Sequence, residues 1–101
     1  MSERIEKIKQ AIEHLAQVPA EHVESVPLRE MYEDKLVWEG VVEMFVLLGH
    51  PVAPCAYGWC MGTGDQARYK AVLHIPPVDS AQTAVRAAIV AEARKQSPRN
   101  G

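Results

Sequence analysis

The stretch MFVLLGHPVAPCAYGWCMGTG, residues 44–64, contains no Asp, Glu, Lys or Arg. It is as long as a membrane-spanning helix, which needs about 20 apolar residues. Its glycines and prolines, however, would break a continuous helix at several points. The stretch is therefore predicted to comprise the end of one strand, a Gly-His-Pro turn at residues 49–51 and the first strand of a hairpin.

Strands are expected on both sides of that turn. Residues 36–48 are rich in Val, Leu, Phe and Trp and are predicted to form the longest strand, with apolar residues on both faces. Residues 55–61 and 66–75 are predicted to pair as a hairpin. A short edge strand at 28–33 is a further expectation, because Pro27 is tolerated at the start of an edge strand.

Helices are predicted at both ends of the chain. Residues 2–18 carry a narrow stripe of isoleucine and leucine at spacings of three and four residues, and residues 80–96 carry an alanine-rich stripe after Asp79 or Ser80 as the N-cap. The order of helix, three or four antiparallel strands over about residues 28–75, and helix predicts an α+β fold. We expect a two-layer sandwich in one domain, 1–101, with both helices on the same sheet face.

The hairpin register predicts a second sheet face with aromatic and basic side chains. With a loop at residues 62–65, Trp59 would face Arg68 and Tyr57 would face Lys70. The opposite face carries small residues, which suit the close approach of a helix. The aromatic and basic face would then be the core of a homodimer, a surface covered by the first helix, or an exposed binding surface. A slip of one residue would exchange the two faces.

Cysteine and histidine supply the candidates for catalysis or metal binding. His50 and Cys55 are the nearest candidates for a base and a nucleophile, but no sequence motif orients them. We therefore expect His50 to cap a turn and Cys55 to pack as a small hydrophobic residue. Cys55 and Cys60 are five residues apart, which places them on opposite faces of a strand, and the histidines lack ligand spacing. No catalytic residues, metal site or cofactor are predicted.

Two carboxylates lie on one face of the predicted longest strand. Glu39 and Glu43 are about 13 Å apart along it, which is wider than the usual carboxylate pair of a glycosidase. Ion pairs with cations on a neighbouring strand or subunit are therefore expected.

The distribution of charge excludes some classes of partner. Residues 1–43 carry ten acidic and five basic side chains, whereas residues 65–101 carry three and six, and the net charge is −2. Nucleic acid is therefore not favoured as a partner, since phosphate binding requires clustered Lys and Arg. No targeting segment is recognised at the amino terminus, so a cytoplasmic location is expected, with both cysteines reduced.

Several short motifs together resemble a family of short uncharacterised bacterial proteins, some of the kind carried on mobile gene cassettes. The motifs are WEGVVE at 38–43, GHP at 49–51, YGW at 57–59, IPPVDS at 75–80 and AVRAAI at 84–89. The resemblance covers residues 36–95 and implies a single domain in the bacterial cytoplasm. It brings no catalytic residues with it.

These observations favour a non-enzymatic, oligomeric binding or interaction module, with a second copy of the chain, an unknown protein or a small molecule as partner. The ligand or interface candidates are His50, Cys55, Tyr57, Trp59, Arg68 and Lys70. An alternative is a small enzyme or small-molecule-binding protein that uses His50 and Cys55. Nucleic-acid binding through the aromatic and basic face ranks third.

Overall fold

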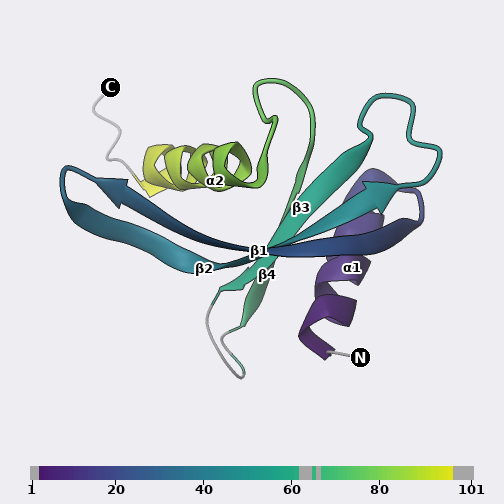
Figure 1. The fold of residues 1–101 in the computed structure, drawn as a ribbon, viewed down its shortest axis with the longest axis horizontal. Helices are drawn as coiled ribbons and strands as arrows, with labels where there is room; N and C mark the ends of the chain where they lie inside the picture. Colours follow the sequence, from purple (N-terminus) through teal and green to yellow (C-terminus); the bar gives the residue numbers. More distant parts are fainter. Residues whose placement is uncertain (1–2, 62–64, 66, 97–101) are drawn as a thin grey trace.

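The fold consists of a four-stranded antiparallel sheet with one helix before it and one after it. The computed structural model describes residues 3–61, 65 and 67–96 of the 101-residue chain. In chain order, the elements are α1 (Glu3–Ala16), β1 (Ala20–Tyr32), β2 (Lys35–Leu47), β3 (Cys55–Met61), β4 (Arg68–Leu73) and α2 (Ala81–Gln96) (Figure 1). The predicted α+β class and the predicted order of elements are confirmed.

The strands follow one another across the sheet in the order β1-β2-β3-β4. β1 begins at Ala20 rather than at residue 28, so it is much longer than predicted. It is an edge strand and most of its side chains are exposed. It therefore lacks the apolar pattern by which a strand is recognised. The turn to β2 is formed by Glu33 and Asp34, which both have positive φ (50° and 66°) and connect the strands in two residues.

The predicted register of the second hairpin is wrong by two residues. Trp59 pairs with Lys70 and Tyr57 with Val72, whereas Arg68 pairs with Met61. A shift of two residues keeps every side chain on its predicted face, because the side-chain period of a strand is two. Most of the predicted loop at 62–65 lies outside the described residues.

α1 packs on the face of β3 that carries its small residues. Ile8 and Ile12 are fully buried there against Phe45 and Ala56. Gly58 permits this approach, since a Cβ atom at that position would lie only 2.4 Å from Cγ2 of Ile8. Because Gly58 has no side chain, α1 can lie close to β3 at this point.

α2 packs on the opposite face, so the expectation of two helices on one face is wrong. Ala84 and Val85 of α2 share a buried cluster with Tyr57 and Trp59 of β3. The helix begins at its predicted cap, where Ser80 Oγ accepts the backbone N–H of residue 83 at 3.2 Å. The sheet is therefore the middle of three layers rather than one of two.

The outer half of the β1–β2 hairpin projects from the sheet as a two-stranded arm, here defined as residues 26–42. β3 pairs with β2 through Glu43–Val46, whereas β1 pairs with β2 along its length. Figure 1 shows the arm extending to one side beyond β3 and β4, alongside α2. An isolated two-stranded hairpin is marginally stable, so the arm depends on what packs against it.

Replacing Gly58 by alanine tests the contact between α1 and β3. We expect Gly58→Ala to destabilise the fold by about 2 kcal/mol or more, because the added methyl group overpacks a full core. Gly40→Ala is the comparison variant, since a Cβ there would meet the Trp38 indole within the arm rather than α1. Urea unfolding measures both. Equal losses of stability in the two variants would show that α1 does not lie against Gly58 as described.

Candidate functional site

The predicted aromatic and basic face is covered by the protein's own second helix. Tyr57 and Trp59 are each only 2% exposed and belong to the buried cluster beneath α2. Arg68 and Lys70 share that side of the sheet, as predicted, with Arg68 exposed and Lys70 half-buried on β4. Neither a second subunit nor α1 covers the two aromatic side chains, so this face as a whole is not the open working surface that the sequence suggested.

Trp59 anchors the base of the arm. Its ring meets that of Trp38 edge to face, with centroids 6.0 Å apart and planes at 66°. Trp38 in turn lies over Gly40, where a Cβ atom would come within 2.9 Å of the indole. This aromatic pair holds the arm against the side of the sheet that α2 covers.

His50 has the structural role that was predicted for it. Its Nδ1 atom accepts the backbone N–H groups of Val52 and Ala53, at 3.1 and 2.8 Å. The thiol of Cys55 lies instead 3.8 Å from the hydroxyl of Tyr57. The structure therefore gives His50 and Cys55 separate partners rather than joining them as base and nucleophile.

A chain of three polar side chains crosses the sheet face beside α2. The Cys55 thiol donates to the Tyr57 hydroxyl, and that hydroxyl lies 2.7 Å from Nδ1 of His74. The backbone N–H of His74 donates to the carbonyl of Cys55, which fixes the end of the chain. Burial, followed by the hydrogen bond with Cys55, raises the pKa of Tyr57 far above its ordinary value. The phenol therefore stays protonated. Sequence analysis named Cys55 and Tyr57 among the ligand or interface candidates but did not identify His74.

Glu43 is the most buried charged side chain among the described residues, at 1% exposure. Its carboxylate accepts hydrogen bonds from Arg4 of α1 and from Ser25 of β1, and His22 Nε2 lies 2.8 Å from Oε1. Arg4 also donates to the carbonyl of Val41 at 2.8 Å, so one arginine ties the start of α1 to β2. Glu43 does form an ion pair, but with Arg4 of the helix α1 rather than with a cation on a neighbouring strand or subunit as expected.

Burial and hydrogen bonding act in opposite directions on Glu43. Loss of water raises the pKa of the carboxyl group, but the hydrogen bonds from Arg4, Ser25 and His22 outweigh it and hold the pKa below its ordinary value of 4.5. The carboxylate is thus ionised at neutral pH. Oε2 accepts from Arg4, and Oε1 accepts from Ser25 and His22, so the cluster is a structural clamp that joins α1, β1 and β2.

A second buried carboxylate connects the arm to α2. Arg86 Nε donates to Glu30 at 2.7 Å and Gln82 Nε2 donates at 3.2 Å, so two residues of the helix hold one residue of β1. The hydrogen bond from Arg86 is the main cause that lowers the pKa of Glu30. Together with Leu28 and Trp38, which pack beneath α2, this contact secures one side of the arm.

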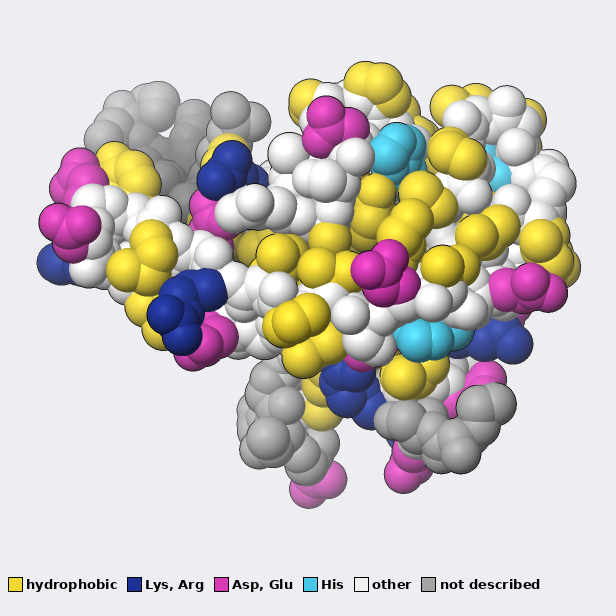
Figure 2. All heavy atoms as spheres, viewed as in Figure 1, with side chains coloured by type: hydrophobic (Ala, Val, Ile, Leu, Met, Phe, Trp, Pro, Cys, Tyr) yellow, Lys and Arg dark blue, Asp and Glu magenta, His cyan; other side chains and the backbone are white. Residues whose placement is uncertain are grey.

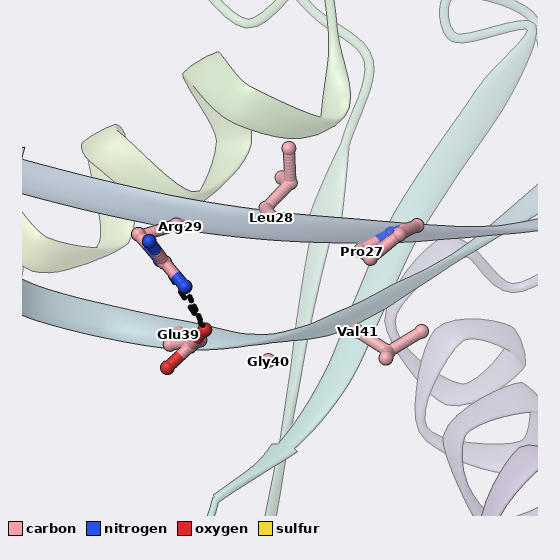
Figure 3. A pocket seen from close by; sticks show the side chains of 6 residues that line it. All are labelled: Pro27, Leu28, Arg29, Glu39, Gly40 and Val41. Atoms are coloured by element: carbon pink, nitrogen blue, oxygen red, sulfur yellow. Dashed lines mark hydrogen bonds and ion pairs between the residues drawn. The ribbon is translucent and has the colours of Figure 1, made fainter.

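The other side of the arm is open and hollowed. A shallow groove of about 510 Å³ lies along the paired strands, with Pro27 and Val41 at one end and Arg29 and Glu39 at the other. Figure 3 shows Leu28 pointing toward α2, whereas Arg29 bridges to Glu39 across the two strands. Arg29 Nη2 lies 2.9 Å from Glu39 Oε2, and both side chains are more than half exposed. This pair confirms the ion pair expected at Glu39.

The tip of the arm exposes large hydrophobic side chains. Tyr32 is 68% exposed and Leu36 is 51% exposed, and Met31 and Val37 are each nearly half exposed. Figure 2 shows hydrophobic side chains on the arm between charged ones, and a further group along the strands in the middle of the molecule. At the opposite end from the arm, Leu48 and Val52 are also exposed. The arm differs from that end because, among the described residues, no helix or strand covers one of its sides.

Other classes of site find no support in the described part of the chain. It holds no group of three or more His, Cys, Asp or Glu side chains arranged for a metal ion. None of its helices has the length and apolar character to span a membrane. Comparison of the chain with protein-family models, with curated proteins and with solved structures gives no match. The resemblance to short bacterial proteins therefore stays a prediction.

Replacing Glu43 by glutamine tests the clamp. We expect Glu43→Gln to lower the free energy of unfolding by about 2–3 kcal/mol at neutral pH, because the amide cannot form the ion pair with Arg4. Glu39→Gln, on the same face of β2 but exposed, should change it by less than about 1 kcal/mol. Urea unfolding at neutral pH measures both variants.

The pH dependence of the same variant has a defined sign. The folded-state pKa of Glu43 lies below its ordinary value of 4.5, so its stabilising contribution is complete above that value and disappears as the pH falls through the folded-state pKa. The difference between wild type and Glu43→Gln should therefore shrink in acid. A difference that stays constant from neutral pH down to about pH 2 would contradict this assignment.

Proposed function

We propose that this chain is a non-enzymatic interaction module that acts as a homodimer, with the projecting arm as its binding surface and the bacterial cytoplasm as its location. The observation that carries the proposal is the open arm: a two-stranded extension, covered by α2 on one side, with exposed hydrophobic residues at its tip and a groove along its other side. Exposed apolar surface of this kind marks sites of protein–protein contact.

The surface area of the whole chain supports a further covering layer. Its accessible surface is 6855 Å², whereas a monomeric protein of 11.2 kDa has about 5,700 Å². The Cα radius of gyration is 14.1 Å, against about 13 Å for a compact domain of this length. The excess of about 1,100 Å² is comparable with the roughly 800 Å² that each partner buries in a standard interface.

A second candidate function is small-molecule binding or catalysis at Cys55, Tyr57 and His74. The hydrogen-bonded chain of these three side chains, on a largely apolar sheet face, favours it. Two observations argue against catalysis: the Cys55 thiol is buried, and it donates a hydrogen bond to the Tyr57 hydroxyl. A cysteine nucleophile, by contrast, reacts as a thiolate paired with a base.

Alkylation of the thiols separates the two candidates. We expect Cys55 in the folded protein to react with iodoacetamide at neutral pH much more slowly than in the urea-unfolded protein, because the thiol is buried and hydrogen-bonded to Tyr57. Mass spectrometry of peptides that contain Cys55 measures the rate. Alkylation of Cys55 as fast as in the unfolded chain would favour the site at Cys55, Tyr57 and His74 over the purely structural role.

Replacing one exposed leucine of the arm tests the homodimer. We expect wild type at micromolar concentrations to have the mass of two 11.2 kDa chains by light scattering. Leu36→Lys should weaken self-association by about tenfold or more, because it places a charge in an apolar contact. Val52→Lys, at an exposed position between β2 and β3, is the matched control and should remain dimeric. A wild-type mass of one chain would refute the proposal, and a monomeric Val52→Lys would move the interface away from the arm.

A further inference from the structure

The centre of the open side of the arm carries one positive and one negative side chain. Arg29 and Glu39 face each other across β1 and β2, and their side chains are 65% and 52% exposed. Both hydrogen bonds from Arg29, from Nε and from Nη2, go to the same oxygen, Oε2 of Glu39. Within the described residues, Nη1 of Arg29 and Oε1 of Glu39 are left for another partner.

The surroundings of the pair make this surface suitable for burial. Pro27 and Val41 flank it in the groove, and Val41 is 38% exposed. Of the described residues of α1, Arg4 reaches the edge of the groove, where it donates to the carbonyl of Val41. The surface is therefore a groove with the apolar residues Pro27 and Val41 at one end and one acid and one base at the other.

The balance of charge indicates which partner fits. A nucleic acid would require an excess of positive charge, and a strongly acidic or basic protein would require an excess of the opposite sign. This groove has neither, because its one base and its one acid cancel. A second copy presents the same two charges, and a two-fold axis brings residue i to residue j and residue j to residue i.

We infer that the open side of the arm packs against the same side of the arm of a second copy, with Arg29 of each chain bound to the partner's Glu39. This inference rests on the proposed homodimer and names its interface. The two arms then form a two-layer contact in which each supplies the covering that the other lacks. The excess surface of about 1,100 Å² for the whole chain is larger than the roughly 800 Å² that each partner buries in a standard interface.

Charge reversal tests this pairing with its own internal control. Arg29→Glu gives an arm with two acids, and Glu39→Arg gives an arm with two bases. Each variant alone should self-associate at least tenfold more weakly than wild type, because like charges then meet across the interface. An equimolar mixture should form a heterodimer, since each acid of one chain meets a base of the other. Arg68→Glu, on β4, changes the net charge by the same amount as Arg29→Glu. It is the control variant and should remain dimeric.

Sedimentation velocity of wild type, each variant and the mixture gives the masses, and urea unfolding monitored by circular dichroism checks that each variant is folded. Weak self-association of both variants with recovery in the mixture supports the inference. Variants that remain dimeric, or a mixture that does not recover, would overturn it while the dimer itself stands. A monomeric wild type would overturn the homodimer as well.

Discussion

The alternation of large and small side chains along β3 is the constraint on which the rest of the structure depends. Gly58 lets Ile8 and the rest of α1 lie directly on one face of the strand. Tyr57 and Trp59 project from the other face and are buried beneath α2. β3 is thus covered on both faces by the chain itself, by α1 on one and by α2 on the other.

This division of the two faces leaves the arm half covered. Because α2 lies over the arm and α1 lies at the opposite end of the molecule, the arm has a helix on one side and none on the other (Figure 1). Trp38 and Glu30 secure the covered side through contacts with Trp59 and Arg86. In the described part of the chain the open side has no such contact with a helix, and the proposed self-association would supply the missing layer.

The sequence predicted the fold class, both helices and β3, because their periodic apolar patterns report burial directly. It did not predict the early start of β1, because the side chains of this exposed edge strand show no apolar pattern. It also did not predict that the helices lie on opposite faces, because both faces of the sheet are apolar and the sequence pattern does not distinguish them. The Glu43 clamp was equally hidden, since His22 and Ser25 reach it from a strand that the sequence did not reveal. Residues that act through long-range convergence carry no local spacing signal.

Hydrogen exchange measured as a function of protein concentration tests the central claim, that the open arm is the interface, most directly. Two-stranded segments open locally when one side is exposed, and burial of that side suppresses the opening. We predict that backbone amides within residues 26–42 become more protected as the concentration rises, while those of β4 do not change. Protection of the arm that is independent of concentration, or a rise in protection confined to residues 48–55, would contradict the account.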